Sequence, residues 1–188
     1  MIKCITKIIK SKCETILAKK TMGKTMKRSK KISYLVQGAA IAALYCVLTL
    51  ISSLFGLSSG VIQLRISECL TVLPCFTPSA VPGLFVGCII SNIITGAAVW
   101  DVIFGSIATL IGALFTYLLR NHKRLVTIPP IVANTLIVPF ILAYVYKREG
   151  SIWYFMLTVG IGEIISCGVF GTIFYNAACR YNLFKNLK

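Results

Sequence analysis

The chain has 188 residues, of which 57% are hydrophobic and 13% charged, whereas about 25% of the residues in a soluble domain are charged. This composition indicates an integral membrane protein and leaves no room for a separate soluble catalytic domain. The net charge is +15, but eleven of the 20 Lys and Arg residues lie within residues 3–31. The charge therefore suits basic segments on the cytoplasmic side of a membrane better than it suits nucleic-acid binding.

The eight cysteines form no Cys-x-x-Cys pair and have no histidine close by in the sequence. This spacing is not that of a metal site. Six of the cysteines lie in or beside apolar segments, where cysteine acts as a small hydrophobic residue. We therefore expect no metal and no cofactor.

Residues 1–31 are rich in lysine and hold no uninterrupted apolar stretch, so they do not predict a secretory signal. Two interpretations remain open: a basic helix at the membrane surface, or an extension upstream of the working start, disordered or not native. We expect a basic N-terminal extension over 1–31, a membrane domain over 32–182 and a short basic tail over 183–188.

The first expected span covers about Tyr34–Leu54. Ala39 and Ala43 lie one helical turn apart within it, and small residues at this spacing let another helix backbone approach closely. A loop, FGLSSG, follows at 55–60. The face that carries the two alanines is thus a candidate surface for another helix.

The stretch from Val61 to Ala98 is too long for one span of roughly 20 residues. Prolines at 74, 78 and 82 favour a turn in its middle, because proline disrupts helical hydrogen bonding. We expect two short spans, 62–77 and 80–97. Gly83 and Gly87 form a face of small residues on the second.

The remaining expected spans are 101–119, 125–146 and 152–179. With six spans, the basic residues before the first span, the basic loop at 120–124 and the basic C-terminus all lie on the cytoplasmic side, as the positive-inside rule requires. The fold class is therefore an all-α bundle of six transmembrane helices, with both termini in the cytoplasm.

Few ionisable residues lie in the apolar segments, and each is a candidate for function because hydrocarbon gives an ion nothing to bind. Arg65 and Glu68 are three residues apart, so on a helix they share a face and can pair. The alternative is that they neutralise each other at the membrane edge. Glu163 lies 11 residues beyond Ile152, or roughly 16 Å along a helix and so near the middle of the membrane.

Several runs of residues together resemble the QueT family of substrate-binding S components in energy-coupling-factor (ECF) importers. They are QLRISE (63–68), LTVLP (70–74), FTP (76–78), VPGLFVG (81–87), DVIFGSIAT (101–109), Pro129-Pro130, Asn134 and GIGE (160–163). The resemblance covers about residues 32–180. It implies a subunit that captures a queuosine precursor, a 7-deazaguanine such as 7-aminomethyl-7-deazaguanine or queuine, from outside the cell.

The resemblance also implies partners: the ECF T component, two ATPase subunits and the lipid bilayer. In this family an Ala-x-x-x-Ala on the first helix docks the T component, and Ala39 and Ala43 match it. A guanine-like edge suits carboxylates, an ammonium suits another carboxylate, and a flat ring suits aromatic stacking. The expected substrate-binding residues are Glu163, Glu68, Arg65, Asn92, Asn134, Asp101 and Trp153. Trp153 equally suits a membrane interface, and Asn134 could bridge helices.

Two alternatives stay open beside this function. One is an S component with another vitamin-like cargo. The other is a different class altogether, a membrane-embedded enzyme or a scaffold. No Gly-x-Ser-x-Gly, Walker or HExxH motif occurs, and the lone histidine, His122, lies in a basic loop. We therefore expect no catalysis, and active transport must draw its energy from a partner.

Overall fold

The structure is a computed structural model that describes residues 30–57, 63–122, 125–147 and 150–181. The chain divides into two units, residues 1–36 and 37–188. In the first unit the described residues, 30–36, are helical and exposed. The expected N-terminal extension and C-terminal tail lie outside the described residues, except that Lys30 and Lys31 already belong to the first helix.

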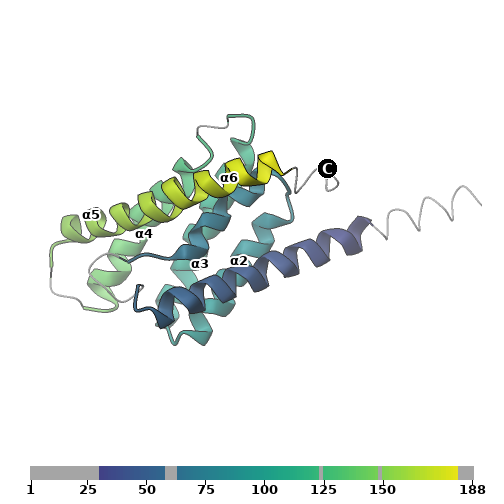
Figure 1. Cartoon of the computed structure of the whole chain (residues 1–188). Coiled ribbons are helices and arrows are strands. Elements are labelled where there is room, and N and C mark those ends of the chain that lie inside the picture. The colour runs from purple at the N-terminus through teal and green to yellow at the C-terminus, as the bar shows by residue number, and fades with distance from the viewer. Residues whose placement is uncertain (1–29, 58–62, 123–124, 148–149, 182–188) are drawn as a thin grey trace, which may run out of the picture. The chain divides into compact units, whose positions relative to one another are not determined.

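Helices joined by short turns make up the described part of the chain, in which no strand occurs (Figure 1). The first helix runs from Lys30 to Leu54. It is followed by η1 (Ile66–Cys75), α2 (Ala80–Ile94), α3 (Val99–Leu118) and α4 (Ile128–Tyr144). The last helix is continuous from Ile152 to Arg180 and consists of α5 (Ile152–Glu163), the π-helical η2 (Ile164–Phe170) and α6 (Gly171–Arg180).

Three of these helices are long and apolar enough to cross a membrane, namely Lys30–Leu54, α3 and Ile152–Arg180. The others, η1, α2 and α4, are shorter but also apolar. Large apolar side chains cover the outside, as a lipid-facing surface requires, with Leu54 and Val99 among the most exposed. The described residues thus contain a helix at each of the six expected spans, with ends that differ by a few residues.

The expected helix at 62–77 is present, but it is shorter than expected. Its residues form a 3₁₀ helix of 10 residues, η1, in which Ser67 to Pro74 are all buried. At about 2.0 Å per residue such a helix is roughly 20 Å long, whereas the hydrocarbon core is about 30 Å thick. η1 contacts α2, α3, η2 and α6. It is an internal element surrounded by other helices, which is why polar residues are tolerated on it.

The proline-rich turn is confirmed. η1 ends at Cys75 and α2 begins at Ala80, so the chain turns between them at Pro78. The Thr77 and Ser79 hydroxyls in this turn both donate to Gln37 Oε1, each at 3.1 Å. The turn is thereby held against the first helix.

Small residues bring the first helix and α2 into close contact. A Cβ atom added to Gly83 would lie 2.6 Å from the Gly38 carbonyl oxygen, and one added to Gly87 would lie 3.0 Å from Ala42 Cα. The face of small residues expected at Gly83 and Gly87 is therefore a packing face. Tyr45, on the same side of the first helix, is buried in the core beside α2 and η1.

Candidate functional site

A polar cavity of about 270 Å³ lies where the ends of several helices meet. Its residues come from the end of the first helix, the segment before η1, the end of α2, the start of α3 and the end of α4. They are Thr49, Ser53, Gln63, Arg65, Asn92, Thr95, Gly96, Ala97, Asp101, Leu142 and Tyr146. Two larger hollows, of about 790 and 470 Å³, are lined almost wholly by apolar side chains of α3 and α4. Of these three cavities among the described residues, the smaller one offers the groups for recognising a polar molecule.

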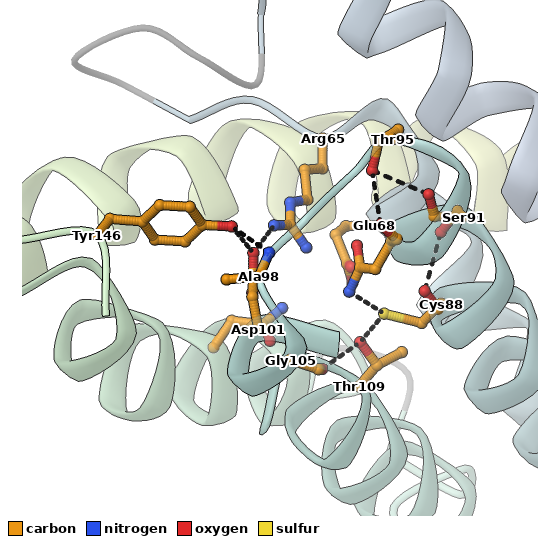
Figure 2. Close-up of polar contacts among 12 residues, drawn as sticks. Arg65, Glu68, Cys88, Ser91, Thr95, Ala98, Asp101, Gly105, Thr109 and Tyr146 are labelled. Carbon is orange, nitrogen blue, oxygen red and sulfur yellow. Dashed lines mark hydrogen bonds and ion pairs between the residues drawn. The ribbon is translucent and has the colours of Figure 1, made fainter. Parts of the chain in front are cut away.

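Asp101 is the centre of the polar contacts around this cavity. The Arg65 guanidinium lies 3.7 Å from Asp101 Oδ2, and the Tyr146 hydroxyl donates to the same oxygen at 3.0 Å (Figure 2). The Tyr146 oxygen in turn accepts from the Ala98 amide at 3.1 Å. The other carboxylate oxygen, Asp101 Oδ1, is buried and has no hydrogen-bond partner among the described residues.

The local sequence explains how Asp101 and Asn92 come together. Asn92 is in the last turn of α2 and Asp101 in the first turn of α3, where the helix dipole favours an acidic side chain. The turn between the helices contains Gly96 with a φ of 72°, a conformation that glycine adopts readily. A Cβ atom at Gly105 would lie 3.1 Å from Asp101 Oδ1 and 3.5 Å from Asn92 Nδ2. Glycine at 105 therefore leaves room for both side chains.

The expected pairing of Arg65 with Glu68 is not what the structure contains. Arg65 precedes η1 with an extended backbone, at φ −104° and ψ 103°, so the two residues do not lie on one regular α-helical face. Arg65 pairs with Asp101 instead. Glu68 Oε1 accepts a hydrogen bond from the buried Tyr45 hydroxyl.

A second polar group lies deeper in the protein and is built around two carboxyl groups. Glu68 is 1% exposed and Glu163 is 6% exposed. An oxygen of each, together with Cys167 Sγ, lies within 4.8 Å of the others. We call Glu68 and Glu163 the carboxyl pair. Neither residue lines the cavity.

Neutral donors surround the carboxyl pair. Asn134 Nδ2 donates to Glu163 Oε1 at 3.0 Å. Cys167 Sγ lies 3.3 Å from Glu163 Oε2 and 3.4 Å from the Glu68 carbonyl oxygen. The remaining oxygen, Glu68 Oε2, is buried without a hydrogen-bond partner in the described part of the chain. The pair thus keeps one free acceptor.

The π-helical segment helps to form this arrangement. Glu163 ends α5, and Cys167 lies within η2, whose wider turns interrupt the regular α-helix. Such interruptions are frequent at functional sites. Because Cys167 follows Glu163 by four residues, both point to the same side of the helix and meet Glu68 there.

The structure groups six of the seven expected substrate-binding residues in these two places. Arg65, Asn92 and Asp101 line the cavity, and the carboxyl pair and Asn134 form the deeper group. Trp153 is not with them: it lies in the first turn of α5 and is 79% exposed.

Sequence reasoning missed three participants: Tyr45, Tyr146 and Cys167. Tyr45 and Tyr146 come from segments distant in the sequence from the acids that they contact, so residue spacing could not predict these contacts. Cys167 was foreseeable, because it lies one helical turn beyond Glu163. Together with the carboxyl pair, Cys167 forms a group whose atoms are close enough to hold a metal ion. The spacing of these three residues in the sequence resembles no metal-binding motif.

Ala39 and Ala43 are both exposed, whereas Ala42 and Tyr45 of the same helix are buried. The next residue at this spacing, Val47, is exposed as well. No described helix therefore covers this face of the first helix between 39 and 47.

Comparison with known proteins places these residues in a family. The family model of the QueT transporter matches residues 35–179, which include every residue of the cavity and of the carboxyl pair. A protein of Lactococcus lactis subsp. cremoris (strain MG1363), named queuosine precursor transporter QueT, is 40% identical over 86 residues. That alignment covers 46% of this chain and 50% of the relative, so the match spans about half of each. No solved structure matches the chain. The family match extends over most of the sequence, and the chain belongs to the QueT transporter family.

Proposed function

We propose that this protein is the substrate-binding S component of an ECF importer and that it captures a queuosine precursor from outside the cell. The observation that carries the proposal is the cavity at Asp101. It is a polar space of about 270 Å³, and the carboxylate of Asp101, one of its lining residues, has a buried oxygen without a partner among the described residues. Family membership and the name of the Lactococcus relative support the same cargo.

The chemistry of the cavity suits the flat edge of a 7-deazaguanine. Such an edge presents N–H donors next to a carbonyl acceptor, and carboxylates and guanidinium groups are the usual protein partners of these two. Asp101 Oδ1 is free to accept, Arg65 can donate, and Asn92 can do both. The volume is close to the lower end of the range of about 300–1,000 Å³ for small-molecule sites. A single bicyclic base is a ligand of suitable size.

The position of the cavity fits capture from outside. Thr49 and Thr95 lie near the ends of the first helix and α2, Asp101 near the start of α3, and Tyr146 just after α4. The basic residue Arg120 follows the other end of α3, and Arg180 is the last residue of the last helix. If the positive-inside rule holds, the basic ends and both termini are cytoplasmic and the cavity opens outward.

Transport then requires partners, which we propose are the T component and two ATPase subunits. A rigid helix face of small residues allows close approach of another helix, and Ala39 and Ala43 offer one that no described helix covers. We assign the docking of the T component to this face. The bundle itself is proposed to be the six-helix type of the ECF S components.

A thermal-unfolding panel tests the proposed cargo. The purified protein is heated with 7-aminomethyl-7-deazaguanine, queuine, guanine and several vitamins. A ligand at a hundred times its Kd stabilises the native state by about 2.7 kcal/mol, so a deazaguanine should raise the unfolding temperature while guanine and the vitamins should not. Stabilisation by a vitamin, with no response to any deazaguanine, would assign the cavity to another cargo.

A further inference from the structure

The deep carboxyl pair has a charge arrangement that the proposed function leaves unexplained. Arg65 forms its ion pair with Asp101 and not with either of the two glutamates. Glu68 and Glu163 have no basic side chain in salt-bridge contact among the described residues. Two carboxyl oxygens within 4.8 Å of each other repel strongly when both are charged and shielded from water. A positive group between the two oxygens would relieve this repulsion, as would a proton on one of them.

The free acceptor points to a ligand rather than to a purely structural pair. Three of the four side-chain oxygens in the pair already have donors, from Tyr45, Asn134 and Cys167. Glu68 Oε2 has none in the described part of the chain, although Glu68 is almost completely buried. A buried carboxylate oxygen that makes no hydrogen bond is costly, so a donor supplied by a ligand would stabilise this arrangement.

The spacing of the pair fits an ammonium group. Because a charge-assisted N–H···O contact is about 2.8 Å long, one nitrogen can contact two oxygens as far as about 5.6 Å apart. The two carboxyl groups satisfy this limit. The sulfur of Cys167, by contrast, already lies at hydrogen-bonding distance from Glu163 and from the Glu68 carbonyl oxygen. In these contacts Cys167 acts as a thiol that keeps its proton, whereas a metal ion would bind the deprotonated thiolate. A nitrogen cation therefore fits the carboxyl pair better than a metal ion does.

The pair is also close enough to the cavity for a short arm to connect them. Glu68 donates its backbone N–H to the Arg65 carbonyl oxygen at 3.0 Å, and Arg65 lines the cavity. Three residues of a 3₁₀ helix rise roughly 6 Å. A flat base in the cavity therefore needs only a substituent of a few atoms to bring a nitrogen near Glu68.

We propose that Glu68 and Glu163 form an ammonium subsite, which binds a protonated amine on a short substituent of the ligand while the cavity at Asp101 holds the flat base. This inference rests on the proposed function and deepens it, because it makes the charge of the substituent the main determinant of specificity. Asn134 and Cys167 are positioning residues that orient the Glu163 carboxyl group. In this arrangement Glu163 contacts the substituent and not the guanine-like edge.

The test compares two ligands of the same size that differ in charge. Calorimetry measures the affinity of the wild-type protein for 7-aminomethyl-7-deazaguanine and for its neutral hydroxymethyl analogue. The wild type should prefer the amine by about 10-fold or more, since a charge-assisted hydrogen bond is stronger than a neutral one. Equal affinities overturn the ammonium subsite without any variant being needed.

Variants then locate the preference. Glu68→Gln and Glu163→Gln should each reduce the preference for the amine over the hydroxymethyl analogue to within about threefold, chiefly by lowering the affinity for the amine. Asp101→Asn is the matched control in the cavity, and it should weaken both ligands by the same factor. If Glu163→Gln instead weakens both ligands equally, Glu163 contacts the base edge and the ammonium assignment is wrong.

Two further outcomes separate this inference from the proposed function. If the wild type binds neither deazaguanine, the proposed function fails and this inference fails with it. If it binds both without preference, the proposed function stands and only the ammonium subsite is rejected. A third outcome would make the carboxyl pair a metal site. In that case Zn²⁺ alone stabilises the wild type but not Glu68→Gln, and the two deazaguanines bind equally well.

Discussion

The Arg65 guanidinium lies 3.7 Å from Asp101, and the carboxylate oxygen that it faces also accepts a hydrogen bond from the Tyr146 hydroxyl at 3.0 Å. These contacts join the segment before η1, the start of α3 and the end of α4. They fix the orientation of Asp101, which lines the cavity and whose second oxygen is buried without a hydrogen-bond partner among the described residues. The contacts of Asp101 thus both connect three parts of the chain and prepare an acceptor for a ligand.

Asp101→Asn should therefore weaken deazaguanine binding strongly. The change removes the charge that balances Arg65 and replaces an acceptor with an amide, which should cost about 1.5–3 kcal/mol, or roughly 10- to 150-fold in affinity. Tyr146→Phe is the matched control, because it keeps the charge of Asp101 and removes only one of the donors to it, so its effect should be smaller than that of Asp101→Asn. Calorimetry measures both. Equal losses in the two variants would mean that the charge of Asp101 contributes nothing.

Gly83→Ala should destabilise the fold. The new Cβ atom would lie 2.6 Å from the Gly38 carbonyl oxygen, so the first helix would have to move away from α2. Overpacking of this kind costs about 1–3 kcal/mol. At Gly160 the nearest atom would be a Thr135 methyl carbon at 3.4 Å, so Gly160→Ala should be neutral or gain about 0.5–1 kcal/mol from helix propensity. Thermal unfolding in detergent compares the two, and equal unfolding temperatures would contradict the close packing.

The proposed topology predicts which exposed positions are labelled from outside. Ser151 begins the last helix at the same end as the cavity, and His122 lies in the basic loop after α3. On a background without native cysteines, Ser151→Cys should react with an impermeant thiol reagent in intact cells, whereas His122→Cys should react only after lysis. The opposite labelling pattern would invert the orientation of the bundle and turn the cavity toward the cytoplasm.

If the T component docks at Ala39 and Ala43, substitutions there should abolish transport without affecting ligand binding. Ala39→Trp or Ala43→Trp should abolish uptake, because an indole ring prevents close approach of another helix. Ligand binding by the isolated subunit should be unchanged, since both alanines are exposed and outside the cavity. Leu44→Trp is the control: Leu44 is also exposed but lies on a different side of the same helix. Normal uptake by both alanine variants would reject docking at this face.

The sequence by itself determined the membrane nature of the chain, most of its helices and its family. Apolar content is a property of each residue and its near neighbours, so the six helices were visible from local patterns. The turn at Pro78 followed from the geometry of proline, and the packing face at Gly83 and Gly87 from residue size. Even the candidate acids were evident, because an ionisable residue in an apolar segment stands out regardless of what it contacts.

Only the tertiary structure decided what those acids contact. The spacing of Arg65 and Glu68 in the sequence allowed the two residues to pair. In the structure, however, the extended backbone before η1 directs Arg65 to Asp101. The helix at Ile66–Cys75 is short and buried because neighbouring helices enclose it, and no local pattern in the sequence shows those neighbours. The cavity and the carboxyl pair likewise exist only where segments distant in the chain meet. Electrostatic pairing depends on distance in space, and the fold alone determines that distance.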